Sequence, residues 1–212
     1  RMLERMLDMD MGEVRIGASD MTLQFFLLPF LEQFHKEYPR IKVTVTNAPT
    51  PETICSLEEG KIDFGVVTTP FSCKSTIHSM MVKPIGTVFI AGDSFGELKG
   101  KKLDYSILGS MPCIFLEKNT STRAFMDAFL SAKGMELPEF ELATSDMIVQ
   151  FAKRNMGVGC VMDGFAKDAI AKGEVFELDF KEKMPLRHIC VVTGENSLIS
   201  LAGRKLLNLF DE

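Results

Sequence analysis

The apolar and polar positions of this chain predict nearly the same order of elements twice, half the chain apart. The first pass predicts a short apolar strand, a Phe- and Leu-rich helix that ends at Tyr38-Pro39, a second strand, a polar turn, a short helix and a third strand. The strands are expected over 14–17, 41–46 and 62–67, and the turn over 47–53. Pro29 interrupts the first helix, so it either kinks the helix or marks the start of its regular part.

The second pass repeats this order after residue 112. Strands are predicted over 113–116, 140–144 and 159–162, with a helix over 123–133, a break at Pro138 and another helix opened by Ser145. Each pass is therefore a βαβαβ unit, for which we expect a parallel sheet with helices on both faces.

Two extended runs outside the repeats, 80–91 and 187–193, are candidates for crossover strands between two lobes. The closing helix, 197–210, has an apolar stripe of helical period and is expected to return to the first lobe. We therefore predict an α/β fold of two βαβαβ lobes joined by two crossover strands. Lobe one would comprise 13–87 plus 192–212, lobe two 88–191, and residues 1–12 would be the end of a helix.

Small hydroxyl residues follow the predicted strands and precede the predicted helices in both halves. Open parallel sheets bind ligands at the carboxyl ends of their strands, and helix N-termini attract anions. We therefore expect a small anionic ligand in a cleft between the lobes, although each hydroxyl could instead only cap its own helix. With two neighbouring residues, the candidate ligand-binding set is Ser19, Met21, Thr22, Thr50, Thr68, Asn119, Thr120, Ser121, Thr144 and Ser145.

The charge balance narrows the function. With 24 basic against 29 acidic residues, the net charge of −5 argues against nucleic-acid binding by this piece. No apolar run approaches the roughly 20 residues of a membrane span. Residues 1–9 are typical of a charged helix end rather than a signal peptide, so we expect a cytoplasmic protein.

The residues that could carry chemistry are scattered. The five cysteines are well separated and lack a CxxC motif, which favours reduced thiols over disulfides or a zinc site. Cys113, Cys160 and Cys190 fall in predicted strands, where a buried, inert thiol is expected. The three histidines stand apart from any nucleophile or metal motif, so we predict no enzyme activity, no cofactor and no metal.

Arg123 is the most prominent single charge, and two interpretations stay open. In the first turn of the second-lobe helix it could clamp a ligand carboxylate. It could equally form an exposed i,i+4 pair with Asp127.

Several strings together resemble the effector-binding domain of LysR-type transcriptional regulators: GEVRIGAS, FFLLPFLEQFHKEYP, GKIDFGVV, IFLEKNTSTRAFMDAFLSAKG and MGVGCVMD. The resemblance covers the chain from Glu13 to Phe210. Asp163 departs from it, because the family usually has Pro there; we expect Asp163 to cap the following helix.

The resemblance implies a periplasmic-binding-protein-like fold of type 2, a small-molecule inducer in the cleft, and a homodimer or tetramer. It also implies an N-terminal winged helix-turn-helix, joined by a linker helix, that would make all DNA contacts. The chain would then be the inducer-sensing part of a cytoplasmic transcription factor. Two alternatives stay open: a free-standing solute-binding protein of a transporter, and a thiol-based redox sensor of the same family.

Overall fold

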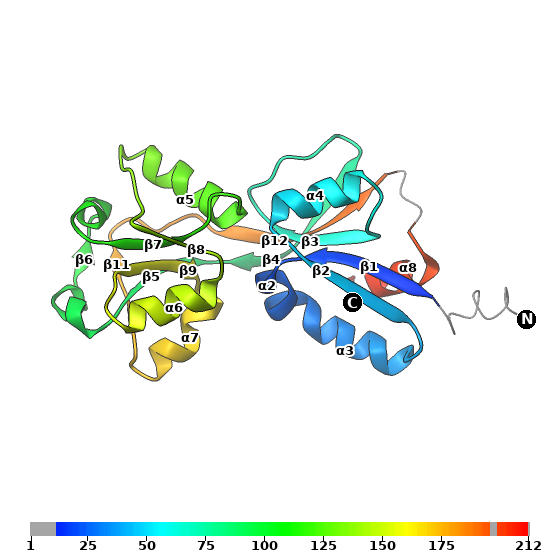
Figure 1. Cartoon of the computed structure of the whole chain (residues 1–212), viewed down its shortest axis with the longest axis horizontal. Helices are drawn as coiled ribbons and strands as arrows, with labels where there is room; N and C mark the ends of the chain where they lie inside the picture. The colour runs from blue at the N-terminus through cyan, green and yellow to red at the C-terminus, as the bar shows by residue number, and fades with distance from the viewer. Residues whose placement is uncertain (1–11, 196–198, 212) are drawn as a thin grey trace, which may run out of the picture. The chain divides into compact units, whose positions relative to one another are not determined.

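The computed structural model describes residues 12–195 and 199–211, and the chain divides into two compact units (Figure 1). Unit 1 comprises Arg1–Pro84 and His188–Glu212, and unit 2 comprises Ile85–Arg187. The chain therefore passes between the units inside the two extended runs that the sequence offered as crossovers. The helix end predicted over residues 1–12 lies outside the described residues, apart from Gly12.

Unit 1 is built on a five-stranded sheet of order β2-β1-β3-β12-β4. Its strands are β1 (Glu13–Ala18), β2 (Lys42–Asn47), β3 (Phe64–Thr68), β4 (Ile77–Ile85) and β12 (Arg187–Gly194). β1 runs parallel to β2 and β3, and β12 runs antiparallel to β3. The predicted parallel unit is confirmed, but an entirely parallel sheet was wrong because the returning strand adds an antiparallel neighbour.

Helices cover both faces of this sheet (Figure 1). They are α2 (Asp20–Thr22), a π-helical segment (Leu23–Leu27), α3 (Leu28–Glu37), α4 (Thr50–Glu58) and α8 (Leu201–Leu209). The ring of Phe210, at the end of α8, lies 5.8 Å from that of Phe64 in β3 and 4.9 Å from that of Phe30 in α3. The closing helix thus packs on the first sheet, as its apolar stripe predicted.

Two boundaries in unit 1 bear on the predictions. Pro29 is the second residue of α3 and follows the π-helical segment without a break in helical backbone, so it marks the change to regular α-helix rather than a free helix start. The carbonyl of Phe25, four residues before Pro29, accepts a hydrogen bond from Lys83 Nζ at 2.9 Å. The turn predicted over 47–53 was wrong in its second half, because α4 begins at Thr50 and takes Pro51 into its first turn.

Unit 2 repeats the arrangement on a sheet of order β10-β5-β9-β7-β8. Its strands are β5 (Thr87–Ala91), β7 (Cys113–Leu116), β8 (Phe140–Leu142), β9 (Val158–Met162) and β10 (Phe176–Glu177). β7 is parallel to β8 and β9, and β5 is antiparallel to β9. The orders β2-β1-β3 and β8-β7-β9 correspond, so the sequence repeat is a repeat of topology.

Alternate residues of β7 supply the two cores of unit 2, because successive strand side chains point to opposite faces. Cys113 and Phe115 pack in the cluster that contains Met126 of α5 (Ser121–Ser131). Ile114 and Leu116 pack in the opposite cluster, with α6 (Ser145–Lys153) and α7 (Asp163–Ala171). Asp163 is the first residue of α7 and Met162 its N-cap residue, so the expected cap was one position off.

Short elements that the sequence analysis did not resolve complete unit 2. They are 3₁₀ segments over Asp93–Leu98 and Tyr105–Ser110, and a small sheet of β6 (Lys102–Leu103) with β11 (Asp179–Phe180). None of the helices in the described part of the chain is long and apolar enough to cross a membrane.

Gly65 in β3 offers a test of the packing between strand and helix in unit 1. A Cβ at this position would lie 2.8 Å from Thr53 Cγ2 and 3.0 Å from Val192 Cγ2. We expect Gly65→Ala to lower the free energy of unfolding in urea by about 1–3 kcal/mol through overpacking. Adding Thr53→Ser, which removes the nearer methyl, should restore part of the loss. Gly96→Ala is the control, because nothing lies within 4 Å of a Cβ added at that position. Equal stability of all variants would contradict the close packing of Gly65 against Thr53 and Val192.

Candidate functional site

The carboxyl ends of β1 and β3 lie side by side in unit 1, because the two strands are parallel neighbours. Ser19 follows β1 directly and caps α2: its Oγ accepts from Thr22 N at 3.3 Å, while Thr22 Oγ1 accepts from Ser19 N at 3.0 Å. The buried Thr22 Oγ1 also donates to Val66 O at 2.8 Å. The start of α2 is thereby attached to β3.

A second hydroxyl attaches α4 to the same edge. Thr50, the first residue of α4, accepts a hydrogen bond from Thr68 N at 3.2 Å, and both threonines are buried. Met21 is buried beside Thr22 in α2. The structure therefore brings the five candidates of unit 1, namely Ser19, Met21, Thr22, Thr50 and Thr68, to one edge of one sheet.

The candidates of unit 2 lie at the corresponding edge. Thr120 caps α5, accepting from Arg123 N at 3.1 Å and donating to Glu117 O at 2.9 Å. Thr144 caps α6, accepting from Met147 N at 3.3 Å. Ser121 and Ser145, the first residues of these helices, are buried, whereas Asn119 is exposed. Because β7 and β8 are parallel neighbours, both helix starts follow the same sheet edge.

Three candidates use their side chains to cap their own helices: Ser19, Thr120 and Thr144. Helix capping is the role that the sequence left open for these hydroxyls as the alternative to ligand binding. A hydroxyl oxygen has two acceptor positions, and a cap uses one of them. The capped helix start still presents its remaining backbone N–H groups. An anion at these edges would therefore be bound mainly by backbone N–H groups. The hydroxyls hold the helix starts in position by capping them.

Arg187 is the residue that sequence reasoning missed. Its side chain is 1% exposed, Nη2 donates to Ser121 Oγ at 3.2 Å, and the guanidinium carbon lies 5.5 Å from the centre of the Phe125 ring. In the sequence, the only signal for Arg187 is a charge at the start of the extended run 187–193, and that run predicts a crossover strand.

The charge of Arg187 persists inside unit 2. Burial lowers its pKa to about 10, while the nearby Cys160 acts in the opposite direction. A pKa of about 10 leaves the guanidinium protonated at neutral pH. A positive charge therefore lies beside Ser121 at the N-terminus of α5, where the helix dipole has the same sign. This part of unit 2 favours an anion.

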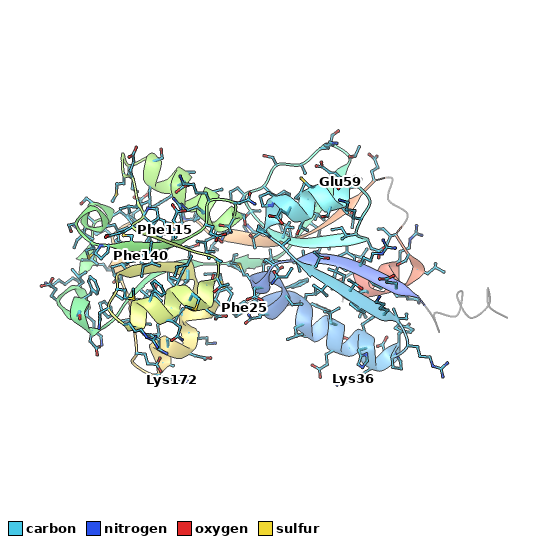
Figure 2. All side chains as sticks on the ribbon, viewed as in Figure 1. Phe25, Lys36, Glu59, Phe115, Phe140 and Lys172 are labelled. Carbon is cyan, nitrogen blue, oxygen red and sulfur yellow. The ribbon has the colours of Figure 1, made fainter. Side chains whose placement is uncertain are left out.

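Arg123 is shown to be a structural residue within unit 2. Nε lies 2.7 Å from Asp127 Oδ1, as the i,i+4 interpretation proposed, but the side chain is buried rather than exposed. Nη1 donates to Leu116 O at 3.0 Å and lies 3.6 Å from Glu141 Oε2. Figure 2 shows Phe115, whose ring centre is 5.7 Å from the guanidinium carbon, on the adjoining strand β7. These contacts join α5 to β7 and β8.

The cysteines divide by burial. Cys113, Cys160 and Cys190 are buried, as their strand positions predicted, whereas Cys55 and Cys73 are exposed. Burial raises the pKa of Cys113 to about 12 and raises the pKa values of Cys160 and Cys190 as well. Thiols in this state carry little thiolate at neutral pH, which disfavours redox chemistry at these three positions. Within the described residues, no group of three or more metal-ligating side chains could hold a metal ion.

Comparison with known proteins identifies the family to which this chain is similar. The sequence pattern described as the LysR substrate binding domain matches residues 8–212. The chain is 21% identical over 213 residues to the HTH-type transcriptional regulator YeiE of Escherichia coli K12, covering 99% of this chain and 71% of that protein. These findings confirm the resemblance noted in the sequence.

Two solved structures share the fold. The CcmR regulatory domain of Synechocystis PCC6803, solved in complex with 2-PG, superposes with a TM-score of 0.83 at 18% identity, covering 94% of this chain and 95% of that one. The effector binding domain of QuiR, in complex with shikimate, gives a TM-score of 0.81 at 15% identity over 94% and 95% of the two chains. The predicted periplasmic-binding-protein-like fold of type 2 is thereby confirmed.

The contacts of Arg123 predict its effect on stability. We expect Arg123→Met to lower the free energy of unfolding by about 1–3 kcal/mol, since Leu116 O loses its donor. Asp127→Asn should cost less than about 1 kcal/mol, because its side chain is 47% exposed. Urea unfolding of both variants measures this. Equal losses would show instead that the exposed pair carries the contribution.

Thiol labelling tests the division of the cysteines. With an excess of maleimide at neutral pH, Cys55 and Cys73 should react rapidly, because they are exposed. Cys113, Cys160 and Cys190 should react only when the protein is unfolded in urea. After mild peroxide treatment the three buried thiols should still be recovered in full. Joint loss of two of them from a folded protein would support the redox-sensor alternative.

Proposed function

Because this chain belongs to the LysR substrate binding domain family, we propose that it is the effector-sensing regulatory part of a transcription factor, and that its effector is a small anion. The proposal is carried by one observation. In each unit, helices begin at the edge where parallel strands end, and one of those helix starts has the buried charge of Arg187 beside it.

The proposed ligand contacts lie in each unit at the sheet edge where helices begin. The edge of unit 1 would contribute Ser19, Met21, Thr22, Thr50 and Thr68, and the edge of unit 2 Asn119, Thr120, Ser121, Thr144 and Ser145. Backbone N–H groups at the helix starts would bind the anion together with Arg187. The solved complexes of CcmR with 2-PG and of QuiR with shikimate support the proposal of a small anionic ligand.

Effector binding would be transmitted to DNA binding through a change in the oligomer. An effector shifts a conformational equilibrium only by its differential affinity for the two states, and here the states would be two geometries of a homodimer or tetramer. DNA contacts would belong to a separate N-terminal winged helix-turn-helix, in keeping with the net charge of −5 of this chain. The protein would act in the cytoplasm and would not be an enzyme.

No specific observation supports either alternative function, the solute-binding protein of a transporter or the thiol-based redox sensor. A transporter's solute-binding protein does not fit the family match. A thiol-based sensor would need reactive cysteines in unit 2, and both cysteines there, Cys113 and Cys160, are buried with raised pKa values.

Arg187 and Arg123 are a matched pair for testing the proposed site. Titration calorimetry with shikimate, inorganic phosphate and sulfate should find a binder among anions. For that anion we expect Arg187→Met to weaken binding by roughly ten- to a hundredfold, because a hydrogen bond to a charged group contributes about 1.5–3 kcal/mol. Thr120→Val should weaken it in the same direction by a smaller factor.

Arg123→Met is the control for a buried arginine lost from the same unit. It should lower stability but leave the dissociation constant within about twofold, because its charged atoms bind Asp127, Glu141 and Leu116 O. Equal weakening by both arginine variants, or tight binding only of uncharged analogues, would contradict the proposed anion site.

A further inference from the structure

The helix that begins at the ligand edge of unit 1 changes its winding soon after its start. α2 continues through the π-helical segment into α3, so residues 20–37 form one run of helical backbone. In the π-helical segment the backbone N–H of Leu28 donates to Leu23 O, five residues earlier rather than four. Single π-helical turns inside α-helices occur frequently at functional sites.

Both ends of this helical run are attached to the sheet of unit 1. At the start, Thr22 Oγ1 donates to Val66 O of β3 at 2.8 Å. Further along, the ring of Phe30 lies 4.9 Å from that of Phe210, which itself contacts Phe64 of β3. With regular α-helix between these points, the start of α2 would turn by about 100° relative to α3, the angle of one residue. The π-helical segment therefore sets how the helix start meets the sheet edge.

A lysine from β4 supports this segment. Lys83 Nζ donates to Phe25 O at 2.9 Å, although 58 residues separate the two along the chain. Phe25 lies on the π-helical segment that follows α2 (Figure 2). In a regular helix the donor to Phe25 O would be the N–H of residue 29, and Pro29 has no N–H. Lys83 thus brings a charged donor to a carbonyl that its own helix cannot serve in the regular way.

The position of Lys83 along the chain gives this contact a second consequence. Lys83 precedes Pro84, the last residue of unit 1 before the chain enters unit 2. One hydrogen bond therefore connects the helix that begins at the ligand edge with the strand by which the chain leaves the unit.

We propose that Lys83 is a positioning residue for the anion site. By donating to Phe25 O it stabilises the π-helical segment and holds the start of α2 in the orientation that binds the effector. The inference rests on the proposed function, because it concerns the same sheet edge, and Lys83 acts through α2 rather than by contact with the anion. Without the lysine, the helix start has the binding orientation for a smaller fraction of the time, and the apparent affinity falls by that fraction.

Amide hydrogen exchange measured by NMR, without any ligand, tests the positioning step. Lys83→Met should accelerate exchange by about three- to tenfold at Thr22 and Leu23, whose N–H groups donate to Ser19 at the helix start. Lys83→Arg keeps a charged donor and should change these rates by less than about twofold. Lys42→Met, which removes an exposed lysine from β2, is the matched control. Unchanged rates at both amides in Lys83→Met would overturn the proposal.

Pro29→Ala tests whether the hydrogen bond, and not the charge of Lys83, is responsible. This substitution restores an N–H four residues after Phe25 and so replaces the donor that Lys83 supplies. In the Pro29→Ala background, Lys83→Met should alter exchange at Thr22 by less than about twofold. The charge is lost in both backgrounds, so equal effects of Lys83→Met with and without Pro29→Ala would show that the bond to Phe25 O is not the cause and would overturn the proposal.

Calorimetric titration with shikimate, inorganic phosphate and sulfate separates this proposal from the one on which it rests. For the tightest binder of the three, Lys83→Met should raise the dissociation constant by about three- to tenfold. Lys83→Arg and Lys42→Met should leave it within about twofold of the wild type. If none of the three anions binds the wild type, the anion site is wrong, and the role of Lys83 in it falls with the site. An anion that binds Lys83→Met as tightly as the wild type refutes the role of Lys83 alone.

Discussion

Parallel strands can neighbour each other only if the chain returns from the end of one strand to the beginning of the next, and helices make that return. In both units this constraint positions the helix starts that form the proposed anion site. In unit 1 it puts the starts of α2 and α4 beside the ends of β1 and β3, and hydrogen bonds from Thr22 to Val66 O and from Thr68 N to Thr50 attach them there. In unit 2 it puts the starts of α5 and α6 beside the ends of β7 and β8.

Two buried arginines in unit 2 show how environment decides the role of a charge. Arg123 is surrounded by its own partners, Asp127, Glu141 and Leu116 O, and joins a helix to two strands. Arg187 instead donates to Ser121 Oγ at a helix N-terminus, where the dipole adds to its positive charge. Burial alone does not distinguish the two residues; the neighbouring groups do.

The net charge of −5 says little about the proposed anion site. The edge of unit 2 that carries Arg187 and the start of α5 is locally positive. Salt screens buried charges much less than exposed ones, so the buried charge of Arg187 acts locally whatever the net charge of the chain.

The sequence by itself determined the repeated strands and helices, the apolar stripe of the closing helix and the hydroxyls that start helices, because these depend on periodicity and on neighbours a few residues away. It also predicted the buried state of Cys113, Cys160 and Cys190. Only the tertiary structure decided the antiparallel pairing of β12 and β5 and the burial of Arg187 against a serine 66 residues away. These features depend on contacts between segments far apart along the chain, and no local pattern of apolar and polar residues encodes such contacts.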